Sequence, residues 1–114
     1  MPYLKIQTNQ TLDQAQQQAL MAKASSLLAK QLGKPETYIM VAIEDGHNML
    51  FAGVPEPTAY LELKSIGLPA DNTASISAAL CNLLAENIGI SPSRTYIEFA
   101  DAARHMWGWN GKTF

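Results

Sequence analysis

A near-repetition within the chain constrains its fold more than any other feature of the sequence. Residues 3–6 (YLKI) resemble residues 60–63 (YLEL), and residues 35–39 (PETYI) resemble residues 92–97 (PSRTYI). Each copy has the length of one supersecondary unit, so the repeat predicts two similar units packed together. With 114 residues, the chain is long enough for one such domain, spanning 1–114, and too short for two.

The first copy holds a helical pattern with recognisable ends. We expect the helix to begin after Thr11, because Thr11 and Gln14 have the spacing of a capping box. Its end is predicted at Gly33, which tolerates the left-handed conformation, and Pro35 blocks continuation. The apolar stripe at helical spacing consists of Leu20, Ala24, Leu27 and Leu28.

The second copy predicts a helix from about Asp71 or Asn72 to Gly89, with the same glycine exit. The flanking segments have strand patterns: residues 58–64 alternate with a period of two, and residues 38–43 are almost entirely apolar. Each strand–helix–strand unit makes a right-handed parallel crossover. The predicted fold class is therefore α+β, with a four-stranded mixed sheet and two helices on one face. Residues 49–52 are a candidate additional short strand.

Two helices cover only one face of such a sheet. Because residues 38–43 are apolar on both of their faces, the second face needs a partner, and the chain has no third helix. We therefore expect a homo-oligomer.

Composition excludes several classes of function. Eight Lys and Arg against ten Asp and Glu give a net charge of -2, which does not favour nucleic acid or an anionic membrane as a partner. The apolar runs are too short to cross a bilayer, and the first residues lack a signal-peptide pattern. The single cysteine, Cys81, permits no intrachain disulfide. These features predict a cytoplasmic protein.

Pro2 is the most informative candidate for chemistry. Removal of Met1 would leave a chain that begins with a secondary amine, and α-amines titrate at about 7.7–8.0, within reach of neutral pH. Burial or a nearby cation lowers this pKa further, so the amine can act as a general base. The alternative is that proline at this position only influences processing.

Three further groups have both a functional and a structural interpretation. Lys34 follows a helix end, where it either binds a carboxylate or complements the helix dipole. Tyr96 either donates a hydrogen bond to a ligand or packs on its strand. Trp107 and Trp109 either wall an aromatic pocket or anchor a subunit contact. His47 and His105 have no second ligand at metal-site spacing, so no metal site is predicted.

Taken together, these residues resemble the macrophage migration inhibitory factor family of the tautomerase superfamily. The matching pieces run in order along the whole chain: Pro2 after Met1, 33–35 with 38–39, 65–67 (SIG), 83–86 (LLAE), 90–92 with Arg94 and 96–97, and 108–110 with 113–114. The resemblance implies a homotrimer whose three sheets face a central channel, with an active site at each subunit boundary.

The resemblance also implies an activity, namely keto–enol tautomerisation of a 2-oxo acid such as phenylpyruvate, without a cofactor. Dopachrome tautomerisation is a further activity of the family. By resemblance, Pro2 is the catalytic base and acid, Lys34 and the backbone N–H of Ile66 hold the substrate carboxylate, and Tyr96 comes from the neighbouring subunit. The pocket-lining residues implied in the same way are Tyr38, Trp109 and Phe114.

The chain departs from the vertebrate members of the family at several positions. Residues 58–61 (TAYL) replace their Cys-x-x-Cys pair, Glu98 replaces Asn, Trp107 replaces Val and Tyr3 replaces Met. Glu98 is expected to add charge near the site and Trp107 to add bulk at its mouth. Two alternatives to the enzyme stay open: a binding or signalling protein that keeps this fold, and a regulatory ligand-binding module, neither of which needs a free proline amine.

Overall fold

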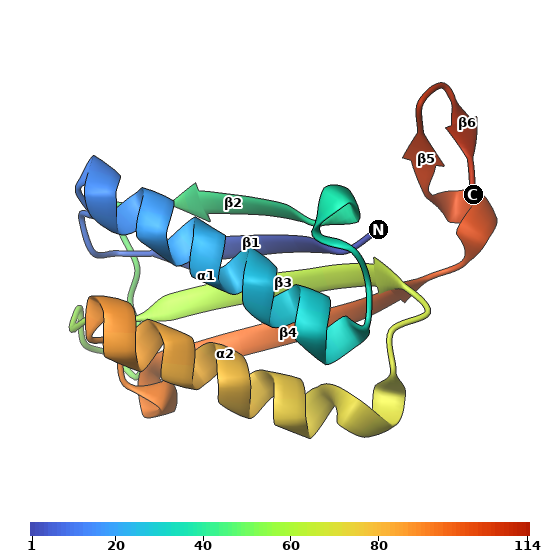
Figure 1. The fold of residues 1–114 in the computed structure, drawn as a ribbon. Coiled ribbons are helices and arrows are strands. Elements are labelled where there is room, and N and C mark those ends of the chain that lie inside the picture. The colour runs from blue at the N-terminus through green and yellow to red at the C-terminus, as the bar shows by residue number, and fades with distance from the viewer.

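Two long helices lie side by side on one face of a four-stranded sheet (Figure 1). The computed structural model describes residues 1–114. The helices are α1 (Gln14–Leu32) and α2 (Thr73–Ile88). The strands, in the spatial order β2-β1-β3-β4, are β1 (Tyr3–Thr8), β2 (Met40–Glu44), β3 (Ala59–Ile66) and β4 (Thr95–Ala102). A small hairpin of β5 (Gly108–Trp109) and β6 (Lys112–Thr113) stands beyond one end of the sheet, near the N-terminus (Figure 1).

The strand pairing confirms the predicted repeat. Strand β1 is parallel to β2 across α1, and β3 is parallel to β4 across α2. The two units meet through the antiparallel pair β1–β3, which makes the sheet mixed. The predicted α+β architecture, with both helices on one face, is therefore correct.

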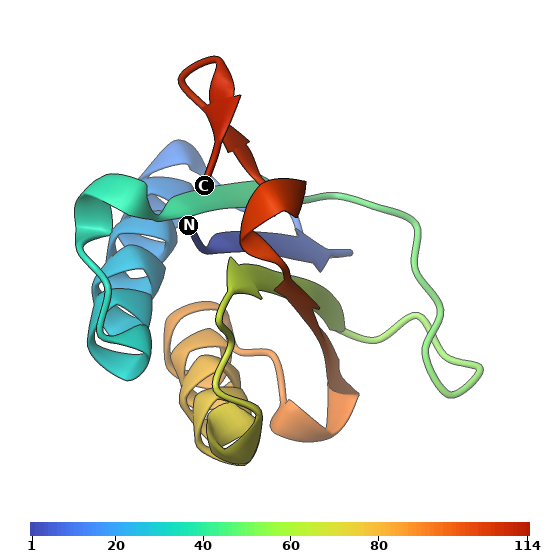
Figure 2. The same cartoon turned by 90° about the vertical axis from the view of Figure 1, so that its right-hand side faces the viewer.

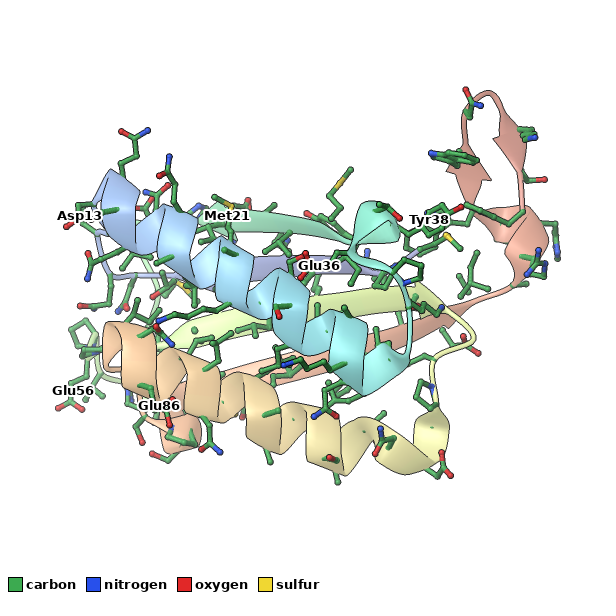
Figure 3. All side chains as sticks on the ribbon, viewed as in Figure 1. Asp13, Met21, Glu36, Tyr38, Glu56 and Glu86 are labelled. Carbon is green, nitrogen blue, oxygen red and sulfur yellow. The ribbon has the colours of Figure 1, made fainter.

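The N-cap of α1 lies two residues beyond the predicted cap, so the capping box of Thr11 and Gln14 was wrong. Asp13 is the N-cap, and its carboxylate accepts from the Gln16 backbone N–H at 2.8 Å while the Gln16 side chain accepts from the Asp13 N–H at 3.1 Å. The segment before the cap is tied to a distant loop, because the Leu12 N–H donates to the Asp45 carboxylate at 2.9 Å. Figure 3 shows Asp13 at the beginning of the helix.

Of the other predicted boundaries, those of the helices are confirmed and those of two strand segments are wrong. Helix α2 follows Asn72 as predicted, and both helices end at glycines in the left-handed conformation, Gly33 with φ 63° and Gly89 with φ 68°. Tyr38, however, ends a short 3₁₀-helix, η1 (Glu36–Tyr38), and the strand begins only at Met40. The candidate strand at residues 49–52 is reduced to one isolated bridge between residues 51 and 54. This segment, between β2 and β3, extends away from the sheet (Figure 2).

The core fills the space between the helices and the sheet. Its fully buried side chains from β1 and β3 meet those from α1 and α2, and each such leucine or isoleucine contributes about 1.5–3 kcal/mol of transfer free energy. The largest members are Leu4, Ile6, Leu20, Leu28, Leu61, Leu63, Ile76, Leu80, Leu84 and Ile90. Neither helix is both long and apolar enough to span a membrane.

The opposite face of the sheet is mixed: β2 contributes the apolar Met40 and Ala42 to it, whereas the neighbouring strands contribute charged residues. On this face, Lys5, Glu62 and Glu98 lie in register on three neighbouring strands. The ammonium groups of Lys5 and Lys64 each lie 3.7 Å from the Glu62 carboxylate. In β2 the apolar residues Val41 and Ile43 pack on the core. Residues 40–43 are thus apolar on both of their faces, as predicted, but the charged residues on β1 and β3 weaken the argument for an oligomer from an apolar face alone.

Candidate active site

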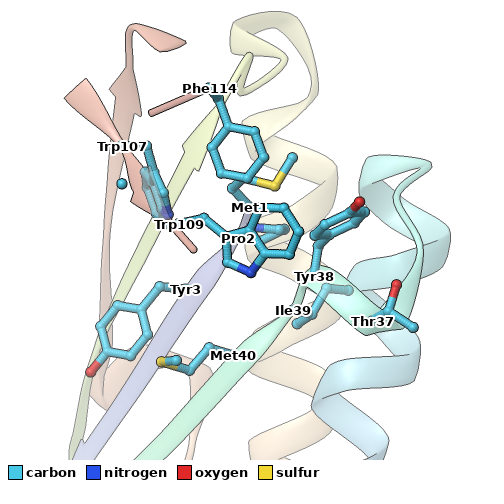
Figure 4. Close-up of a pocket in the computed structure, with 11 residues that line it drawn as sticks. Met1, Pro2, Tyr3, Thr37, Tyr38, Ile39, Met40, Trp107, Trp109 and Phe114 are labelled. Carbon is cyan, nitrogen blue, oxygen red and sulfur yellow. The ribbon is translucent and has the colours of Figure 1, made fainter. Parts of the chain in front are cut away.

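A cavity of about 580 Å³ opens where β1 and β2 begin, beneath the C-terminal hairpin (Figure 4). Its walls come from three segments that are distant in sequence: the N-terminus, the end of η1 with the start of β2, and the C-terminal hairpin. The lining residues are Met1, Pro2, Tyr3, Thr37, Tyr38, Ile39, Met40, Trp107, Gly108, Trp109 and Phe114.

Aromatic rings form one wall of this cavity. The rings of Trp109 and Phe114 stack with centroids 5.8 Å apart, and Tyr38 meets both edge-on at 5.9 and 6.4 Å. The Phe114 backbone N–H donates to the Trp107 carbonyl at 3.2 Å, which holds the C-terminus against the hairpin. Both tryptophans thus line the pocket, as the pocket interpretation of the sequence predicted. Such a wall suits a planar aromatic ligand.

A tight turn places Trp109 and Phe114 in this wall. Asn110 and Gly111 have φ of 53° and 76°, the left-handed values that a two-residue hairpin with matching twist requires. Asparagine and glycine adopt these values at low cost, so the local sequence favours the hairpin.

Pro2 is buried at the end of the cavity, next to the first residue of β1. Its carbonyl accepts from the Met40 N–H at 3.0 Å, which ties the start of the chain to the neighbouring strand. Met1 carries the terminal amine here, and burial lowers the pKa of that amine below its ordinary value, with the positive charge of Lys34 as the second cause. With Met1 present, the Pro2 nitrogen is an amide; a chain that begins at Pro2 has its amine in this cavity.

Lys34 lies directly after the glycine that ends α1, and its side chain reaches the end of β3. The ammonium donates to the Ser65 hydroxyl at 3.0 Å and to the Ile66 carbonyl. Burial lowers the pKa of Lys34, and the nearby charge of Asp101 partly opposes this effect. The fold therefore brings Lys34 and Ile66 together beside the cavity, although neither is among the residues that line it.

Tyr96 lies far from the cavity of its own chain. It is opposite Tyr60, which is in turn opposite Gln7 at the other end of β1 from Pro2. Gln7 lies five positions along the chain from Pro2, which at about 3.3 Å per residue is about 16 Å. The Tyr96 side chain is 64% exposed. Glu98 is likewise on the open sheet face, where its carboxylate lies 3.3 Å from the Tyr60 hydroxyl, so it adds no charge to the cavity of its own chain.

Three further residues line the cavity that were not predicted from the sequence, namely Thr37, Ile39 and Met40. A signal was available for one of them, because Met40 is opposite Tyr3 in the parallel pair that the repeat implies.

Comparison with known proteins identifies the family. The family model described as macrophage migration inhibitory factor (MIF) matches residues 1–114. This chain belongs to the macrophage migration inhibitory factor family. A MIF homolog of Brugia malayi is 39% identical over 115 residues, covering 100% of this chain and 99% of the relative. MIF of Rattus norvegicus is 36% identical over 98 residues, covering 85% of each.

Solved MIF structures have the same fold. The MIF homologue from Prochlorococcus marinus superimposes with a TM-score of 0.93 at 41% identity, covering 98% of both chains. MIF of Toxoplasma gondii gives a TM-score of 0.93 at 30% identity, covering 98% of this chain and 99% of the other. The architecture predicted from the repeat is thus that of the MIF family.

Proposed function

We propose that this protein is a keto–enol tautomerase for 2-oxo acids of the phenylpyruvate type, with the N-terminal amine of Pro2 as general base and acid. The observation that carries the proposal is the position of Pro2, buried in an aromatic-walled cavity where burial lowers the pKa of the terminal amine that Met1 carries here. An amine that is neutral near pH 7 can accept a proton without help from histidine.

In the proposed reaction, the neutral Pro2 nitrogen removes the hydroxyl proton of the enol. The O–H bond breaks, the C=C electrons move to form a C–H bond at the adjacent carbon, and the C=O group forms. The proton for that carbon comes from the Pro2 ammonium, so the amine is regenerated. General acid–base transfer of this kind contributes roughly 10²–10⁴-fold to the rate, and correct orientation of the substrate supplies a further part.

Lys34 and the backbone N–H of Ile66 are the proposed partners of the substrate carboxylate. The Lys34 ammonium has three donors, of which two are used on Ser65 and Ile66. A carboxylate beside it would be held at the end of the cavity where Pro2 lies. The substrate ring would then pack on the wall formed by Tyr38, Trp109 and Phe114.

The proposed assembly is a homotrimer, in which Tyr96 of one subunit completes the site of its neighbour. The register supports this arrangement, because Tyr96 is about 16 Å along the sheet from Pro2 of its own chain. An exposed tyrosine at the far end of the sheet is positioned to meet a second copy. A reducing, cytoplasmic environment is also part of the proposal, since Cys81 is a free thiol. Dopachrome-type substrates, which carry a planar ring, suit the same wall.

Processing at the N-terminus provides the test. Mass spectrometry would verify homogeneous samples with Met1 removed and with Met1 retained, and a phenylpyruvate tautomerase assay would compare them. We expect the processed form to be active and the retained form to lose nearly all activity, because an amide nitrogen is not basic. Pro2→Gly, which keeps an amine but loses the ring, should lower kcat/KM by about 10²-fold or more. Equal turnover by both forms would refute the mechanism and favour a binding or signalling protein of this fold.

A further inference from the structure

A single arginine holds the loop between β2 and β3 against the start of β4. The Arg94 guanidinium donates from Nε to the Pro57 carbonyl at 2.9 Å and from Nη1 to the Phe51 carbonyl at 3.1 Å. Its Nη2 donates to the carbonyls of Val54 and Glu56 at 3.0 and 3.1 Å. All three guanidinium nitrogens are therefore used on carbonyls of one loop. A lysine has no planar fork with which to make this set of bonds.

The same guanidinium also orders an aromatic pair. The Arg94 Cζ atom lies 5.2 Å from the centroid of the Phe51 ring, within the range of a cation–π contact. The Phe51 ring in turn meets the Tyr96 ring edge-on, with centroids 4.8 Å apart and planes at 67°. Arg94 thus fixes Phe51 twice, through its backbone carbonyl and through its ring.

Within its own chain, Tyr96 lies opposite Tyr60, and its ring pairs with that of Phe51. Its side chain is 64% exposed, and its hydroxyl makes no hydrogen bond within the chain. A tyrosine in this position on a strand samples several staggered rotamers unless a neighbour selects one. The Phe51 ring is that neighbour.

We propose that Arg94, acting through Phe51, is a positioning residue that sets the orientation of the Tyr96 side chain for substrate binding. The proposal rests on the proposed function in one respect, namely that Tyr96 is a residue that binds the substrate. Arg94 touches no substrate in this scheme; it reduces the number of conformations that Tyr96 must give up when substrate arrives. Pre-ordering of this kind improves binding without any new contact.

The test is ¹⁹F NMR on protein labelled with 3-fluorotyrosine, combined with kinetics on phenylpyruvate. The chain has four tyrosines, so four resonances can be assigned by Tyr→Phe substitution. Two variants perturb the contact in different ways. Arg94→Lys keeps the charge and removes the fork, whereas Phe51→Leu removes the ring and keeps all four bonds from Arg94 to backbone carbonyls. Arg104→Lys is the matched control, because Arg104 is exposed and its guanidinium makes no hydrogen bond within the chain.

We expect the Tyr96 resonance to shift or broaden in both variants, while the resonances of the other tyrosines and of the control stay in place. The KM for phenylpyruvate should rise by about tenfold with a smaller change in kcat, since the lost contribution is to binding. An unchanged Tyr96 resonance in Phe51→Leu would overturn the proposal, even if Arg94→Lys fails to fold. A moved resonance with unchanged KM would overturn the role in substrate binding. An inactive wild type would refute the tautomerase function, and the resonance would still decide whether Arg94 positions Tyr96.

Discussion

Co-assembly of two defective chains should restore activity if the proposed sites lie between subunits. Pro2→Gly removes the base, and Tyr96→Ala removes the partner at the far end of the sheet. Because the register separates these two residues of one chain by about 16 Å, one chain does not supply both to a single site. A site in a mixed trimer works when its Pro2 comes from a Tyr96→Ala subunit and its Tyr96 from a Pro2→Gly subunit.

The expected size of the effect follows from the symmetry. In a head-to-tail ring assembled from equal amounts of the two variants, each of these two conditions holds for half of the sites, so about a quarter of the sites are intact. The assay is phenylpyruvate tautomerisation after the two chains are denatured, mixed and refolded together. The expected activity is about a quarter of wild type, well above either variant alone.

A matched mixture makes the outcome decisive. In this second mixture, wild type is refolded with an equal amount of the Pro2→Gly/Tyr96→Ala double variant. If sites are shared between subunits, the mixture should again have about a quarter of wild-type activity. If each site lies within one chain, it should have about half. For sites within one chain, the mixture of single variants would only average the two parents. Two results together would refute the shared site: activity of the single-variant mixture equal to the average of the two variants, and half of wild-type activity in the matched mixture. The distance along the sheet between Pro2 and Tyr96 would then not imply a site between subunits.

Two further predictions concern Lys34 and the start of α1. Lys34→Ala should raise KM for phenylpyruvate and move the rising limb of the pH–kcat/KM profile to higher pH. Only the neutral terminal amine accepts a proton, and the positive charge of Lys34 lowers the pKa of that amine. The control is Lys30→Ala, on the exposed side of the helix, and a Lys34→Ala profile identical to wild type would return Lys34 to a helix-end role. Asp13→Ala should lower the free energy of unfolding by about 1 kcal/mol, measured in urea at fixed protein concentration, because it removes the carboxylate that accepts from the Gln16 backbone N–H. Thr11→Ala should have almost no effect, and equal losses in both variants would contradict the observed cap.

The order of the elements could be predicted because it depends on local chemistry. Glycines at the helix exits, Gly33 and Gly89, adopt the left-handed conformation regardless of what surrounds them. The alternation in residues 59–64 similarly predicts a strand with one buried face, as β3 has. The start of α1 was missed although its signal is local, because Asp13 and Gln16 have the same capping-box spacing as the predicted pair, Thr11 and Gln14.

The residues of the candidate site also differ in how far their positions could be predicted from the sequence. Pro2, Tyr38, Trp109 and Phe114 were identified from the sequence, and the cavity contains all of them. Tyr96 was identified as well, yet its distance from Pro2 depends on the register between β1, β3 and β4. Glu98 lies opposite Glu62 on the open side of the sheet, because a cross-strand neighbour is set by pairing, and its place near a site shared between subunits stays a prediction.

By itself, the sequence determined the units of this protein: two strand–helix–strand repeats, the glycines that end both helices, and the tight turn of the C-terminal hairpin. These features arise from interactions among residues a few positions apart, whose energies do not depend on the rest of the fold. Only the tertiary structure decided that the second sheet face carries charged residues, that Lys34 reaches Ile66, and that Arg94 meets Tyr96 through Phe51. Each of these depends on strand register and loop path, since pairing that shifts by one residue moves every side chain to the opposite face.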